Sequence, residues 1–132
     1  MKKNKEELKN INLVKSINTN VRSGTRKIDL ILKSVVGKKV QDALRDLTFS
    51  DKRISKEIKK TIQSAVANAE NNFQYDIDNL FIKEAYSGKS IVMKRFRPRA
   101  KGRSSPIKKP YSRLTIILSD KKTKMVEHGT KS

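Results

Sequence analysis

The stretch Lys94–Arg113 reads KRFRPRAKGRSSPIKKPYSR and contains nine Lys or Arg residues but no acidic residue. Apolar, β-prone runs flank it, Ile91–Met93 before it and Leu114–Leu118 after it, and its middle is rich in Gly and Pro, which favour turns. This pattern predicts two strands, at about 89–98 and 106–119, joined by a basic tip. So many like charges on one narrow ribbon repel each other unless a polyanion neutralises them. We therefore expect the function of the chain to lie in this hairpin.

The net charge of the 132-residue chain is +19, and it is unevenly distributed. Residues 1–84 carry 18 basic and 11 acidic side chains, whereas residues 85–119 carry ten basic side chains and no acidic one. This asymmetry predicts an anionic partner, with a phosphate polymer as the first candidate and an anionic membrane as the second. The length supports one compact domain, which we place at 13–120. We expect a flexible basic extension at 1–12 and a flexible tail at 121–132.

The composition argues against an enzyme. The absence of cysteine excludes disulfides, thiolate catalysis and cysteine-based zinc sites. The single histidine, His128, lies in a polar C-terminal stretch and cannot form a histidine dyad or cluster. The acidic pairs Asp42/Asp46 and Asp76/Asp78 are more typical of exposed helix charge and turns than of a magnesium site. We therefore predict no catalytic residue, no metal site and no cofactor.

The sequence also favours a cytoplasmic protein without a membrane partner. No run approaches the ~18 apolar residues that a membrane span needs, and the first residues lack the apolar run of a secretory signal. A cationic membrane-active protein would need a helix with basic and bulky apolar faces. Here the basic cluster lies instead on a hairpin interrupted by Pro and Gly.

Apolar spacing predicts three helices before the hairpin. Residues at i, i+3, i+4 and i+7 form one stripe from Ile28 to Val35 and another from Val40 to Leu47. We expect Ser23 or Thr25 to cap the first helix and Gly37 to end it with a positive φ. The longest helix is predicted at about 51–72, capped by Ser50 and stopped by Asn71-Asn72.

Strands are predicted at 13–21 and 80–86, with a turn at Gly88 before the two arms of the hairpin. The fold class is therefore α+β, with three helices packed on a small antiparallel sheet and a long protruding β-hairpin. An arm of ten residues reaches about 30 Å at strand rise, so the hairpin should project beyond the body. Pro106 and Pro110 cannot donate ladder hydrogen bonds, which leaves the regularity of the returning arm open.

Residues 22–120 resemble the bacterial L-twenty-two (L22) family of large-subunit ribosomal proteins. The resemblance rests on GKKV at 37–40, SAVANAENN at 64–72, MKRFRPRAKGR at 93–103 and LTIILSD at 114–120. It implies a structural protein that binds 23S ribosomal RNA, takes part in subunit assembly and has no catalytic role. It also implies a body near the exit of the peptide tunnel and a cytoplasmic location in the ribosome. The implied partners are 23S rRNA, neighbouring large-subunit proteins and the nascent polypeptide.

The resemblance further implies that the hairpin tip lines the tunnel wall. The tip residues are Pro98, Arg99, Ala100, Lys101, Gly102 and Arg103.

Basic side chains of the hairpin and body are the predicted RNA contacts, because a guanidinium can grip phosphate with two hydrogen bonds. In the hairpin they are Lys94, Arg95, Arg97, Arg99, Lys101, Arg103, Lys108, Lys109 and Arg113. In the body they are Arg22, Arg26, Lys27, Lys38 and Lys39, although Lys38 and Lys39 would also complement a helix dipole. Lys56, Lys59 and Lys60 are at least as consistent with a solvated helix face.

Strand alternation predicts Arg95, Arg97 and Arg99 on one side of the hairpin, with Phe96 and Pro98 on the other. Phe96 and Tyr111 could stack on unpaired bases or pack against each other across the hairpin, and the sequence leaves both open. The alternative function is a basic DNA-binding or nucleoid-type protein that places its β-ribbon in a groove. The prolines and the length of the hairpin favour RNA over that alternative.

Overall fold

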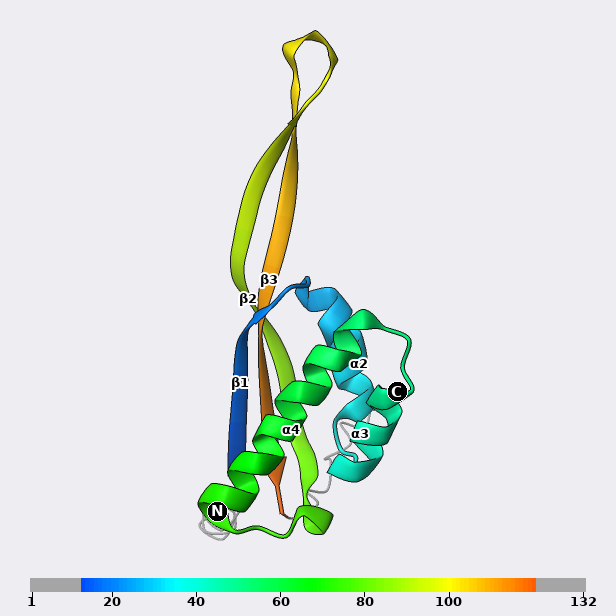
Figure 1. The fold of residues 1–132 in the computed structure, drawn as a ribbon, viewed down its shortest axis with the longest axis vertical. Coiled ribbons are helices and arrows are strands. Elements are labelled where there is room, and N and C mark those ends of the chain that lie inside the picture. Colours follow the sequence, from blue (N-terminus) through cyan, green and yellow to red (C-terminus); the bar gives the residue numbers. More distant parts are fainter. Residues whose placement is uncertain (1–12, 121–132) are drawn as a thin grey trace, which may run out of the picture.

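The structure of the protein, a computed structural model, describes residues 13–120. The predicted extension at 1–12 and tail at 121–132, with His128, lie outside the described residues. In chain order the elements are β1 (Leu13–Val21), α2 (Thr25–Val35), α3 (Val40–Thr48), α4 (Arg53–Phe73), a 3₁₀ turn (Ile77–Asn79), β2 (Phe81–Pro98), a second 3₁₀ turn (Ala100–Gly102) and β3 (Ser104–Ser119). The helices gather beside one end of the sheet, while β2 and β3 continue alone far beyond them (Figure 1). The predicted fold class is confirmed.

The sheet has three antiparallel strands in the order β1-β3-β2. The central strand β3 joins the body to the hairpin: in the body Thr115 pairs with Ile17 on one side and Tyr86 on the other. Beyond the end of β1, β3 pairs with β2 only. The hairpin is therefore a direct extension of the sheet that forms the core.

The predicted turn at Gly88 is wrong. β2 runs without a break from Phe81 to Pro98, and Gly88 pairs with Arg113. Gly88 is not among the residues with positive φ. Because β3 offers a continuous partner, the extended conformation is hydrogen-bonded through the glycine. The ladder instead shifts register between Lys89 and Val92, and such a bulge increases local twist where the hairpin leaves the body.

One face of the sheet and the apolar stripes of the helices form the core. Alternate residues of β3, Leu114, Ile116 and Leu118, are fully buried. The stripe of α2 is buried throughout, and in α3 and α4 only Leu44 and Val66 are half-buried. The small residues Ala65 and Ala69 of α4 are completely buried. The helical pattern in the sequence is thus confirmed.

The helix ends differ from the prediction. The N-cap residues are Gly24 and Lys52, and neither helix has a side-chain cap. Ser50 instead accepts a hydrogen bond from the Ser55 hydroxyl at 2.9 Å. Gly37 has the expected positive φ, at 82°. The last helix extends to Phe73 and ends at Gln74, whose φ is 55°.

The returning arm of the hairpin stays regular despite its prolines. Pro106 pairs with Phe96, Pro110 pairs with Val92, and β3 continues through both. In the hairpin β3 has a neighbour on one side only, so a proline nitrogen can face the open edge without removing a ladder bond. At the tip, Lys101 and Gly102 both have positive φ, 59° and 68°, and complete the turn.

Candidate nucleic-acid interface

Residues 89–110, called the ribbon below, form a two-stranded hairpin with no core of its own. All are exposed except Ser105, which is half-buried. The exposed residues include large apolar side chains such as Ile91, Met93 and Phe96, which are 62%, 41% and 75% exposed. A two-stranded hairpin of this kind is marginally stable alone in water. Its surface is therefore suited to being covered by a partner.

The strand register places cations on both faces of the ribbon, because paired residues of antiparallel strands share a face. One face carries Arg95 opposite Ile107 and Arg97 opposite Ser105. The other face carries Lys94 directly opposite Lys108. Like charges at such a pair destabilise a hairpin. No ion pair is formed by any ribbon residue within the described chain. No acidic side chain of residues 13–120 therefore offsets the repulsion between these cations.

The register agrees with the predicted alternation of Arg95 and Arg97 on one side and Phe96 and Pro98 on the other. Arg99 lies past the last paired residue of β2, where its backbone N–H donates to the Arg103 carbonyl at 2.8 Å. It belongs to the tip with Lys101 and Arg103.

Of the two alternatives for Phe96 and Tyr111, the one in which the rings pack against each other across the hairpin is wrong. Phe96 pairs with Pro106, which lies five positions from Tyr111 along β3. At strand rise that separation is about 16 Å, too far for ring contact across the hairpin. Tyr111 is half-buried while Phe96 is exposed. Stacking of either ring on a base stays a prediction.

The basic body residues fall into two separate groups. Lys38 and Lys39 lie between α2 and α3, away from the ribbon (Figure 1). The Lys38 ammonium donates to the Asp46 carboxylate at 2.7 Å, and this bond holds the pKa of Asp46 below its usual value, helped by the nearby Arg45 charge. The Lys39 ammonium lies 5.9 Å from the centre of the Phe81 ring. Both lysines therefore have structural partners that compete with RNA contact.

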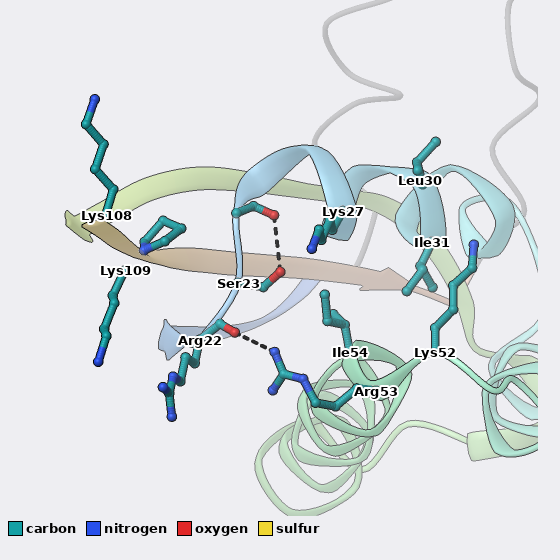
Figure 2. A pocket seen from close by; sticks show the side chains of 12 residues that line it. Arg22, Ser23, Lys27, Leu30, Ile31, Lys52, Arg53, Ile54, Lys108 and Lys109 are labelled. Atoms are coloured by element: carbon teal, nitrogen blue, oxygen red, sulfur yellow. Dashed lines mark hydrogen bonds between the residues drawn. The ribbon is translucent and has the colours of Figure 1, made fainter. Parts of the chain in front are cut away.

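The second group lies at the root of the ribbon and lines a groove with a volume of about 610 Å³ (Figure 2). We call it the root groove. Its lining residues are Arg22, Ser23, Gly24, Lys27, Leu30, Ile31, Lys52, Arg53, Ile54, Lys108, Lys109 and Pro110. Six of them are cations and none is acidic. The groove thus joins the body to the returning arm of the ribbon in one positive surface.

Lys52 and Arg53 were missed by the sequence analysis. Lys52 immediately precedes α4 and Arg53 is its first residue. Both lie far along the chain from the ribbon, and only the fold makes them line the same groove as Lys108 and Lys109. The Arg53 guanidinium donates to the Arg22 carbonyl at 2.7 Å, which fixes its position. One local feature of the sequence could have indicated them. The first turn of α4 contains no acidic residue, although acidic residues are usually favoured at that position. Arg26, predicted beside this group, is exposed but does not line the groove.

The acidic pairs considered as a magnesium site have partners of their own. Asp76 accepts from the Asp78 backbone N–H and from the Asn79 side chain, and Asp78 accepts from Gln41. Asp42 lies 3.4 Å from Arg45. Across residues 13–120 no three metal-ligating side chains cluster together. Within the same range, no helix combines the length and apolar character that crossing a bilayer requires.

Comparison with known proteins identifies the domain. The family model described as Ribosomal protein L22p/L17e matches residues 16–119. The Large ribosomal subunit protein uL22 of Pelagibacter ubique (strain HTCC1062) is 62% identical over 131 residues, which cover 99% of this chain and 98% of that protein. The chain belongs to the ribosomal protein L22p/L17e family.

Other proteins of the L22p/L17e family are nearly as similar. The uL22 protein of Maricaulis maris (strain MCS10) is 55% identical over 100 residues, covering 76% of this chain and 79% of its own length. That of Bartonella henselae is 53% identical over 109 residues, with 83% and 84% covered. As a member of this family, the chain is a structural protein of the large ribosomal subunit in the cytoplasm and not an enzyme. The matched range includes both the ribbon and every residue of the root groove.

Proposed function

We propose that this chain binds 23S ribosomal RNA through its ribbon and the basic residues at the ribbon's root, and that this binding helps the large subunit to assemble. The ribbon tip, residues 98–103, lines the exit tunnel and contacts the nascent polypeptide. The body binds neighbouring large-subunit proteins and RNA at the subunit surface. This function requires no cofactor and no chemical step.

A single observation carries the proposal: the ribbon is exposed and cationic on both faces and forms no ion pair within residues 13–120. A flat partner such as a membrane or a protein surface would cover only one face. Folded ribosomal RNA surrounds an inserted element with strands on several sides, and it supplies phosphates for the cations and bases for the exposed apolar side chains.

The same observation explains what the protein does for RNA. Phosphates from neighbouring RNA strands repel each other when the RNA folds compactly. A thin cationic ribbon between those strands neutralises phosphates on both sides and releases their counterions. The ribbon thereby stabilises a compact arrangement of RNA, and the RNA in turn stabilises the ribbon.

The test compares the affinity of the full chain for a folded 23S rRNA transcript and for duplex DNA of equal nucleotide content, at matched salt. We expect tighter binding to the transcript, with a log–log salt slope that reports several phosphate contacts at about 0.7–0.9 per phosphate. Equal or tighter binding to duplex DNA would favour the β-ribbon DNA-binding function instead. Locating the chain in a map of purified large subunits would test the position of the tip.

A further inference from the structure

We propose that the root groove holds one unpaired nucleotide of RNA, with the phosphate among its cations and the base against its apolar wall. The inference rests on the proposed RNA-binding function and adds to it a defined pocket, new contact residues and a class of ligand. The groove lies where α2, α4 and the returning arm of the ribbon meet (Figure 2).

The charge of the groove selects an anion. Its six cations come from α2, α4, β3 and the segments that precede the two helices, and no lining residue is acidic. None of them forms an ion pair within residues 13–120. The Arg53 guanidinium is held by the Arg22 carbonyl at 2.7 Å and uses one of its five N–H donors there. A pre-positioned guanidinium with free donors is suited to phosphate.

The apolar residues of the lining favour a ligand that carries an apolar surface in addition to a phosphate. Leu30 is 66% exposed at the groove, and Pro110 lies beside Gly24, 3.9 Å from the point where a Cβ on that glycine would be. Together with Ile54 these side chains supply the apolar part of the groove lining, called its apolar wall here. A phosphate alone would leave this wall in water, whereas a base can cover it. The volume of about 610 Å³ falls in the range of about 300–1,000 Å³ typical of small-ligand pockets.

An unpaired nucleotide fits this lining better than a duplex or an acidic peptide. In an A-form duplex the base faces are stacked and cannot reach an apolar wall, while a splayed-out base can. An acidic peptide would match the charge, but the groove is continuous with the ribbon through Lys108, Lys109 and Pro110. The RNA that covers the ribbon therefore reaches the groove directly. A nucleotide bound there contacts body and ribbon together and fixes the direction of the ribbon.

The experiment measures binding of the full chain to a 23S rRNA transcript, with base-specific chemical modification of unpaired nucleotides in the same complexes. The groove variants are Lys27→Gln/Lys52→Gln and Leu30→Ala, all at exposed positions. The matched control is Lys56→Gln/Lys60→Gln, which removes two exposed charges from α4 outside the groove. Arg53 is left intact because its guanidinium supports the backbone at Arg22.

We expect Lys27→Gln/Lys52→Gln to weaken binding and to lower the salt slope by about 1.4, the value for two contacts to single-stranded phosphate. Leu30→Ala should weaken binding about fivefold with an unchanged salt slope, at the low end of base-stacking effects because leucine has no ring. Both should expose the same unpaired nucleotide to modification. The control should bind within about twofold of the wild type, since an exposed charge far from a bound phosphate is screened.

Several outcomes would overturn the inference, and they can be told apart. If the wild type does not bind the transcript, the proposed function fails and the groove assignment fails with it. If the wild type binds but the groove variants behave like the control, only the groove assignment fails. A loss confined to the charge variant would show phosphate binding without a base. Displacement of the protected nucleotide by a poly-glutamate decapeptide at equal charge, with sensitivity to Leu30→Ala, would assign the groove to an acidic peptide.

Discussion

Ser112 ties the root of the ribbon to the body through one buried hydrogen bond. Its hydroxyl donates to the Ser23 carbonyl at 2.6 Å, and both residues are buried. Ser112→Ala removes this donor from a site that water cannot easily enter. We expect the free energy of unfolding to fall by about 1–3 kcal/mol, as measured by urea denaturation. Ser105→Ala in the ribbon is the matched control and should change it by less than about 0.5 kcal/mol; equal effects would contradict this role.

Asp46 provides a local test of the ion pairs around α3. Its pKa is lowered from 3.8, mainly by the hydrogen bond from Lys38. A carboxyl with a lowered folded-state pKa stabilises the fold above its unfolded-state pKa, and this stabilisation is lost as the pH falls through the lower folded-state value. Lys38→Gln should therefore raise the pKa of Asp46 toward 3.8 and reduce that pH dependence below about pH 4, while the Arg45 charge keeps part of it. An NMR titration of the carboxyl carbon measures the pKa, and an unchanged value in the variant would contradict the pairing.

The sequence predicted those residues whose conformation follows from their own chemistry. Gly37 has the positive φ that was expected for it, and Gly102, in the tip where a turn was predicted, has one as well. Lys101 shares that conformation without any signal in its side chain, because the tip geometry imposes it. The predicted helix N-caps were wrong for a similar reason. Ser23 or Thr25 was predicted to cap α2, but the N-cap is Gly24 and the Ser23 hydroxyl donates to the Gly24 carbonyl. The Ser23 carbonyl accepts from Ser112, 89 positions away along the chain, a contact that no local pattern contains.

At the scale of elements, the ribbon should be limited by repulsion between its own strands. Lys94 and Lys108 are paired directly. Lys108→Glu converts this pair from repulsive to attractive, and such cross-strand pairs contribute about 0.2–1 kcal/mol. We expect slower amide exchange of the ribbon in the free protein and, because a predicted phosphate contact is lost, weaker binding to 23S rRNA. Exchange monitored by NMR and the binding assay described above provide the two measurements.

The matched control for this prediction is Lys89→Glu, which makes the same charge change opposite Ser112 rather than opposite a lysine. Exchange in that variant should resemble the wild type. If Lys108→Glu accelerates exchange, or if both variants slow it equally, repulsion within the Lys94–Lys108 pair does not limit the free ribbon.

Helices were easier to predict than the connections of the strands. The apolar stripes of α2, α3 and α4 are one-dimensional patterns, and the buried side chains follow them. Whether a strand continues through Gly88 depends on the partner strand, and that pairing lies 25 positions away at Arg113. The root groove escaped prediction for the same reason, since its lining combines the starts of two helices with the end of the ribbon.

For the molecule as a whole, the two ends differ in how their charges are satisfied. All three ion pairs within the described chain involve Lys38 or Arg45 with Asp42 or Asp46, at the helical end. The ribbon at the other end has nine Lys or Arg residues and no such pair. The body therefore has its own core and internal partners, whereas the ribbon has neither and, under the proposed function, is stabilised by RNA. This division predicts that body docking and tunnel lining can be separated by mutation.

The separating variant replaces Arg99–Arg103 with Asn-Gly, the two-residue turn that joins antiparallel strands most readily. The last pair before the tip, Pro98 with Ser104, lies outside the replaced segment, so the arms and the root groove should remain. We expect this variant to enter large subunits at wild-type stoichiometry, measured by quantitative mass spectrometry, while a map of those subunits shows an altered tunnel wall. The control Arg99→Gln/Lys101→Gln/Arg103→Gln removes the same charges but keeps the tip length, and it should leave the shape of the wall unchanged. Absence of the shortened variant from assembled subunits would mean that the tip is needed for docking and that the two ends of the molecule do not act separately.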